Sequence, residues 1–154
     1  MNTVFELLSN DSINMELDHF ENVVKKISQS AGSGETQDDS KFFKYNWMPF
    51  VMAALIGFRQ KSSRPLTGNK KSDVFKYINI YRGSDHLFKL LVLNVVSLHG
   101  YDVLNDKSRI KKTIEEHANS GFDFISDVIK DKNTFLADVH YLEFLRDYQK
   151  NNNY

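Results

Sequence analysis

Residues 49–58 read PFVMAALIGF and form the longest apolar run in the chain. The run is much shorter than the roughly 20 residues that a membrane-spanning helix needs. It therefore predicts a helix that is buried on all sides at the centre of a globular domain. Asn46 is a good N-terminal cap for this helix, and Pro49 would then lie in its first turn, where a missing N–H does little harm. Gly57 would either allow a close crossing by a second helix or begin the helix end.

Segments that follow this run supply further helices. Ser84 and Gly100 are a start and a stop signal, and they predict an apolar core helix that uses Leu87, Leu90, Leu91, Leu93, Val95, Val96 and Leu98. A longer helix begins near Asp106 or Ser108, contains a potential kink at Gly121, and turns one apolar face to the core through Ile110, Ile114, Ala118, Phe122, Ile125 and Ile129.

Two further segments complete the predicted fold. Residues 133–150 predict a last amphipathic helix, and residues 74–81 fit either a short strand or a helix. With only 2 Pro and 7 Gly in 154 residues, long helices are favoured over a many-turned β-sandwich. The sequence therefore predicts an all-α fold, a compact irregular bundle of about five to six helices.

The N-terminal quarter differs in composition from the rest of the chain. Residues 1–29 predict an acidic helical arm, capped at Asp11 or Ser12, whose apolar residues recur at spacings of four and three: Ile13, Leu17, Phe20, Val24 and Ile27. This stripe is suited either to packing on the core or to joining two copies of the chain. Residues 30–40, SAGSGETQDDS, predict a flexible linker to a helical core domain at 41–150, and residues 151–154 predict a disordered tail.

Charge is segregated along a chain whose net charge is zero. Residues 1–40 hold eight acidic residues and two lysines, whereas residues 41–82 hold nine basic residues and one aspartate. Five of those bases lie on one turn-rich loop: Arg59, Lys61, Arg64, Lys70 and Lys71. Such a loop is suited to binding a polyanion such as nucleic acid. The alternatives are a solvated loop, or a loop that faces the acidic arm of the same chain.

No residue pattern indicates catalysis or metal binding. The chain has no cysteine, which excludes disulfides, thiolate zinc sites and a cysteine nucleophile. No glycine-rich phosphate loop, nucleophile elbow or zincin motif is present, and Glu115 and Glu116 are expected at the surface, paired with Lys111 and Lys112. The five histidines are scattered at His19, His86, His99, His117 and His140. We therefore expect no enzyme activity, no metal and no cofactor.

Three stretches in order resemble small proteins encoded beside bacterial DNA phosphorothioation (Dnd) gene clusters, which belong to phage defence. They are residues 50–66, FVMAALIGFRQKSSRPL, residues 87–106, LFKLLVLNVVSLHGYDVLND, and residues 110–129, IKKTIEEHANSGFDFISDVI. The chain departs from that pattern by its additional helix at 133–150 and by His117 in place of an aromatic residue. The resemblance implies an accessory part in a defence system and transfers no catalytic residue.

These observations lead to two functional hypotheses. The first is a non-enzymatic adaptor of an anti-phage or DNA-modification system, which binds a partner protein, and DNA as a further ligand, through the loop at 59–71. The second is a self-associating structural or regulatory protein, a homodimer joined by the Ile13–Ile27 stripe. The N-terminus lacks the basic region of a signal peptide, so we expect a cytoplasmic protein without membrane contact.

Overall fold

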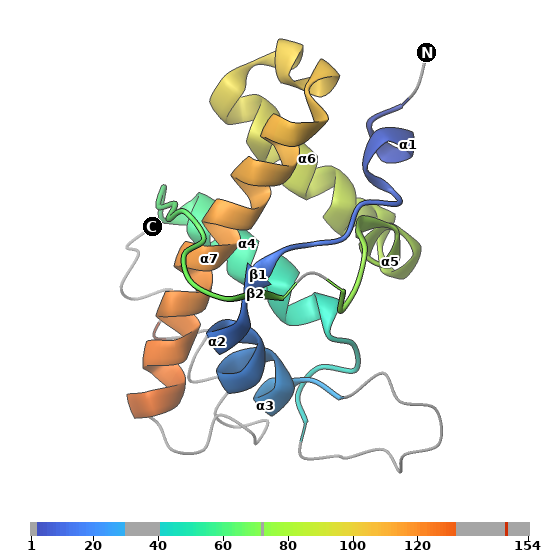
Figure 1. Ribbon diagram of the computed structural model, residues 1–154. Coiled ribbons are helices and arrows are strands. Elements are labelled where there is room, and N and C mark those ends of the chain that lie inside the picture. Colours follow the sequence, from blue (N-terminus) through green and yellow to red (C-terminus); the bar gives the residue numbers. More distant parts are fainter. Residues whose placement is uncertain (1–2, 30–40, 72, 132–146, 148–154) are drawn as a thin grey trace.

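The computed structural model describes residues 3–29, 41–71, 73–131 and 147. Helices dominate it, which confirms the predicted all-α fold (Figure 1). One continuous helix from residue 17 to 27 contains a π-helical turn at its middle. The helical elements are α1 (Val4–Leu8), α2 (Leu17–His19), η1 (Phe20–Val24), α3 (Lys25–Ile27), α4 (Trp47–Arg59), α5 (Tyr77–Gly83), α6 (Asp85–His99), the 3₁₀ turn η2 (Tyr101–Asn105) and α7 (Lys107–Asp131).

The central feature is the crossing of α4 and α7, the most extensive helix pair in the described residues (Figure 1). A Cβ atom at Gly57 of α4 would overlap the backbone carbonyl of His117 on α7. Reciprocally, a Cβ atom at Gly121 of α7 would overlap the carbonyl of Ala53 on α4. Gly57 therefore permits the close crossing of α7 over α4. This was one of the two roles expected for it, the other being to begin the end of the helix. Gly121 also permits this crossing, and the helical assignment of α7 continues through it.

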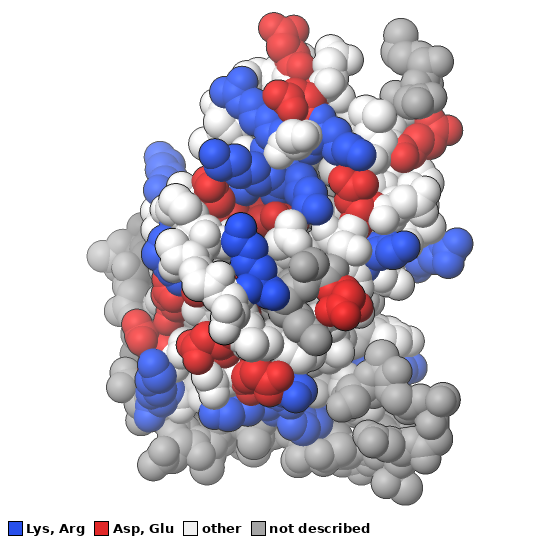
Figure 2. All heavy atoms as spheres, in the orientation of Figure 1, with Lys and Arg blue, Asp and Glu red and all other residues white. Residues whose placement is uncertain are grey.

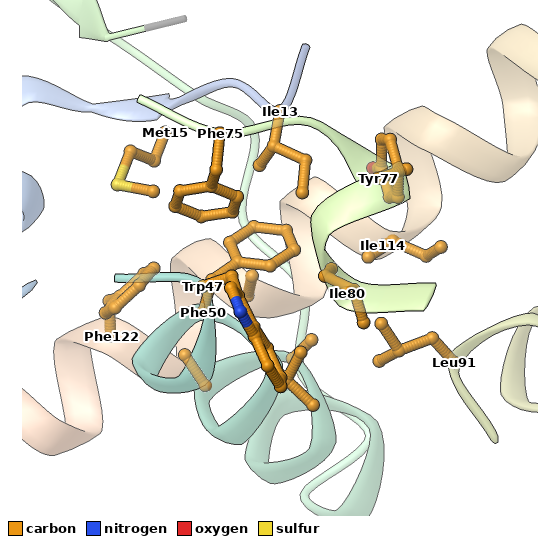
Figure 3. Close-up of a cluster of buried hydrophobic side chains, with 14 of the residues drawn as sticks. Ile13, Met15, Trp47, Phe50, Phe75, Tyr77, Ile80, Leu91, Ile114 and Phe122 are labelled. Carbon is orange, nitrogen blue, oxygen red and sulfur yellow. The ribbon is translucent and has the colours of Figure 1, made fainter. Parts of the chain in front are cut away.

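Around this crossing the core is built largely from aromatic and β-branched side chains (Figure 3). Phe50 of α4 is fully buried, and its ring centre lies 5.7 Å from that of Phe75 and 6.4 Å from that of Phe122. The predicted apolar face of α7 is confirmed, because five of its six members are buried: Ile110, Ile114, Ala118, Phe122 and Ile125. Asn46 immediately precedes α4, as predicted, but its side chain makes no capping hydrogen bond; its Oδ1 accepts instead from the Ser28 hydroxyl at 2.7 Å.

Within residues 74–81 the helix α5 begins at Tyr77, and Lys76 before it makes only an isolated bridge to Ser12, so the alternative of a short strand there was wrong. The side-chain oxygen of Asn79 accepts a hydrogen bond of 2.7 Å from the backbone N–H of Lys76, which fixes the first turn of α5. The short strands lie elsewhere, at β1 (Met15–Glu16) and β2 (Lys70–Lys71), which pair antiparallel. This two-residue ladder ties the N-terminal segment to the loop that follows α4.

The N-terminal segment belongs to the main core and is not a separate arm. Its helix begins at Leu17 rather than near residue 12, because the preceding backbone pairs with residues 69–77: Ile13 donates to Phe75, and Leu17 to Asn69. Four of the five stripe residues are buried in the core, and Leu17 packs against it; the four are Ile13, Phe20, Val24 and Ile27. The structure thus shows the first alternative, packing within the chain. The predicted linker, tail and most of the last helix lie outside the described residues.

The helix α6 has the predicted ends but a different environment. The hydroxyl of Ser84 accepts a hydrogen bond from the Leu87 N–H, and Gly100 follows the helix with a φ of 81°. However, α6 lies at the edge of the bundle and packs through one face only, so three of its predicted core residues are exposed: Leu90, Leu93 and Leu98. Among the described residues, no helix has both the length and the hydropathy required to span a bilayer.

The helix crossing predicts the effect of adding a single methyl group. We expect Gly57→Ala and Gly121→Ala each to lower the free energy of unfolding by at least about 2 kcal/mol, because the new Cβ meets rigid backbone. Alanine is otherwise the better helix former, by about 1 kcal/mol, so a destabilised variant identifies the steric effect. Urea unfolding measures it, with Ser97→Ala on the exposed side of α6 as the control. Unchanged or increased stability would contradict the close crossing.

Candidate functional site

The structure places the bases of the 59–71 loop at separate sites rather than on one surface. Arg59 ends α4 and lines a groove toward α6. Lys61 is exposed in the turn after α4, with a left-handed φ of 52°. Arg64 points into a polar network, and Lys70 lines a different cavity beside α7. Lys71 lies in β2, but its side chain is outside the described part of the structure.

Arg64 is the centre of a polar network that joins four segments. Its Nη1 lies 2.9 Å from Oε1 of Glu16 in β1, and its Nε lies 2.7 Å from Oδ2 of Asp123 in α7. Asn119 of α7 adds a contact of 3.3 Å and also donates to the carbonyl of Arg64. The ring of His19 in α2 lies 3.3 Å from both Arg64 and Asp123. One guanidinium thus holds β1, α2 and α7 to the loop after α4.

The environment fixes the charges in this network. Partial burial acts to raise the pKa of Glu16, but hydrogen bonds from Arg64, Thr67 and Asn119 lower it to about 2. Burial lowers the pKa of His19 despite the neighbouring carboxylates of Asp123 and Glu16. His19 is therefore neutral at neutral pH, and its contact with Asp123 is a polar contact rather than an ion pair.

The network has the character of a structural connection rather than a catalytic centre. Both carboxylates are occupied by the same guanidinium, and a carboxylate with a pKa near 2 is a poor general base. No group of three or more histidine, aspartate or glutamate side chains in the described residues is arranged to hold a metal ion. Of the other histidines, His117 is buried, stacks on Phe58 and contacts the Thr113 carbonyl.

Glu115 is buried, so its expected position at the surface was wrong. Its carboxylate accepts hydrogen bonds from the backbone and side-chain amides of Asn14, at 3.0 and 3.3 Å, and lies 3.9 Å from Lys111. Burial raises the pKa of Glu115 to about 7, although Asn14 and Lys111 act to lower it. The fully buried hydroxyl of Tyr77 has no hydrogen-bond partner among the described residues, and burial together with Glu115 and Asp11 raises its pKa.

The outer face of α6 carries exposed leucines that were expected in the core. Leu93 is 61% exposed and Leu90 is 42% exposed, opposite the buried Phe88, Leu91 and Val95 on the same helix. Two apolar grooves flank this ridge. The first, between α4 and α6, has a volume of about 470 Å³ and includes Trp47, Val51, Met52, Leu55, Leu87 and Leu90. The second, between α1, α6 and η2, has a volume of about 520 Å³ and includes Val4, Phe5, Val92, Leu93, Tyr101 and Leu104.

Sequence reasoning missed the network and the ridge for different reasons. Nothing local indicates that Glu16 and Asn119, 103 residues apart, share an environment. The ridge did leave a signal, because Leu93 lies on the opposite side of a helical wheel from Leu91 and Val95. A helix that is apolar on both sides has either a buried position or an exposed interaction face.

Removal of Arg64 tests the structural role of the network. We expect Arg64→Ala to lower the free energy of unfolding by about 2 kcal/mol, because Glu16 and Asp123 lose their shared cation. Arg64→Lys keeps the charge but not the forked geometry, so its loss should be intermediate. Denaturant unfolding at neutral pH provides the measurement, with the exposed Arg82→Ala as the control. Equal stability of the Arg64 and Arg82 variants would argue against the network.

The raised pKa of Glu115 predicts a pH dependence of stability. The folded state retains this proton up to about pH 7, whereas the unfolded chain loses it near pH 4.5. The contribution of Glu115 to stability is therefore complete below pH 4.5 and is lost as the pH rises to about 7. We expect Glu115→Gln to gain on the order of 2–3 kcal/mol relative to the wild type between those pH values. The measurement is the free energy of unfolding in urea, as a function of pH, for the wild type and for Glu115→Gln. A constant difference between the two proteins at all pH values would contradict the raised pKa.

Similarity to known proteins gives no independent assignment. No family model matches the chain, and the comparisons with curated proteins and with solved structures gave no match. The function of this chain must accordingly be argued from its own geometry.

Proposed function

We propose that this protein is a non-enzymatic adaptor that binds an amphipathic helix of a partner protein on the outer face of α6. The single observation that carries this proposal is the exposed ridge of Leu90 and Leu93 between two apolar grooves. Contiguous exposed apolar surface of this kind is unfavourable in water unless a partner covers it. This location replaces the basic loop as the proposed contact with a partner protein.

The shape of the face is suited to a helix. Grooves between packed helices accept side chains that recur at three- and four-residue intervals on a partner helix. The wall of the first groove includes Met48 and Met52, whose flexible thioethers adapt to different apolar side chains. Leu90 lines the first groove and Leu93 the second, so one partner segment lying along the ridge contacts both.

The charges beside the grooves indicate the character of the partner. Among the described residues, each groove is lined by a single charged residue, and in both cases it is basic: Arg59 in the first, and Lys89, which also pairs with Asp85 at 2.9 Å, in the second. A partner helix with acidic residues flanking its apolar stripe complements this arrangement. A second copy of the same face would instead bring basic residues together, which favours a different protein as the occupant. The phage-defence setting is proposed from the sequence resemblance alone.

A designed peptide provides a direct test. The probe is a fluorescent, alanine-based helix of about sixteen residues, with leucines at three- and four-residue spacing and flanking glutamates. We expect Leu90→Gln combined with Leu93→Gln to weaken its binding at least about tenfold, or ~1.4 kcal/mol, in fluorescence anisotropy. Leu98→Gln is the matched control, because Leu98 is also an exposed leucine of α6 but lines neither groove.

Three outcomes would contradict the proposal. The first is equal binding of a peptide with the same composition in scrambled order. The second is an equal loss of binding in the Leu98 variant and the double variant. The third is a wild-type dimer in light scattering that the Leu90 and Leu93 substitutions convert to a monomer, because this would assign the face to a second copy.

A further inference from the structure

A polar cleft lies where β2 and the loop at 65–66 meet the N-terminal half of α7, and it shares no lining residue with the grooves beside the α6 ridge. Its volume is about 380 Å³, and we call it the lysine cleft. Figure 2 shows Lys and Arg side chains, interspersed with Asp and Glu, over this half of α7. The lining residues that carry charge or a hydroxyl group are Lys70, Ser108, Lys111, Lys112, Glu115 and Glu116.

The lysines of the cleft are only weakly neutralised by the protein. Lys111 lies 3.9 Å from Glu115, and Lys112 lies 3.9 Å from Glu116. Both distances exceed the 2.7–2.9 Å of a charge-assisted hydrogen bond, which Arg64 does reach with its carboxylates. Lys70 is exposed and forms no ion pair with any residue that the structure describes. Ammonium groups from two separate elements therefore remain available to an anionic ligand.

Among the other groups of the cleft, Ser108 and Glu115 are compatible with an anion, whereas the Glu116 carboxylate opposes one. Ser108 is in the first turn of α7, a helix of 25 residues whose N-terminus is already capped by Asp106, which accepts from the Arg109 N–H at 3.0 Å, so Ser108 offers a ligand its hydroxyl group. Glu115 forms part of the wall and faces Lys111 of its own helix, Lys70 of β2 and Tyr77 of α5. Because burial raises the pKa of Glu115 to about 7, much of its population is uncharged at neutral pH.

We propose that the lysine cleft binds a phosphate group through Lys70, Lys111 and Lys112, with Ser108 as an additional hydrogen-bond donor. The phosphate can belong to a small phosphorylated molecule or to a nucleic-acid backbone, and both sources present the same chemistry to the three ammonium groups. This site is independent of the apolar face of α6, so either proposal can fail without the other.

Binding measurements on the full chain distinguish the two sources. The probes are inorganic phosphate and a single-stranded oligothymidine of about twelve nucleotides, a length typical of single-strand binding sites. Three phosphate contacts predict that log K falls with log salt concentration at a slope of about −2. We expect Lys70→Ala combined with Lys112→Ala to weaken binding at least about tenfold at low salt and to reduce that slope to about −1.

The matched control is Lys26→Ala combined with Lys130→Ala, which removes two exposed lysines at other positions and makes the same change in net charge. Circular dichroism verifies that both double variants remain helical. Oligonucleotide binding that only the cleft variant loses supports the proposal with nucleic acid as the source. Phosphate binding alone, lost in the same variant, supports a small phosphorylated ligand. Equal losses in both variants, or no binding of either probe, would overturn the proposal.

Discussion

The close approach of α4 and α7 is the constraint on which the rest of this fold depends. Two glycines, one on each helix, let the backbones come nearer than any side chain would allow. Van der Waals attraction increases as the two helix surfaces approach each other. The neighbouring Ala53 and Ala54 have small side chains and are fully buried, so they allow this close approach. Larger side chains of α4 lie beyond the point of closest approach: Phe50 packs against Phe75 and against Phe122 of α7, and the Trp47 ring lies against Gly83 of α5 (Figure 3).

Ion pairs and hydrogen bonds attach further segments to the two crossing helices. Arg64 lies beyond the end of α4 and binds carboxylates from β1 and α7, so the loop after α4 is attached on both sides. The Arg64 N–H also donates to the carbonyl of Glu116, which adds a backbone link to α7. The opposite charges of the N-terminal quarter and the following segment therefore serve in part to hold the chain to itself. That arrangement was one of the alternatives considered for the basic loop.

Local signals predicted the parts of this structure that local physics controls. Ser84 and Gly100 mark helix ends because a side-chain hydrogen bond or a backbone conformation acts within one turn. The apolar face of α7 was equally readable, since its spacing follows the helical period. The network around Arg64, the burial of Glu115 and the exposure of Leu90 depend instead on which segments meet in space. Sequence periodicity shows that α6 is apolar on two sides, but it does not show which segments the helix meets.

The order of the chain has a consequence for how the protein is made. Asn14 and Glu115 are hydrogen-bonded although 101 residues separate them, and Glu16 contacts Asn119 across 103 residues. Contacts of such long range form late, because closing a large loop costs chain entropy before any contact compensates for it. On the ribosome, the first thirty residues must wait until α7 has emerged before they reach their native partners. Until then, the apolar side chains of α4 are exposed to water, and we expect chaperones to bind them.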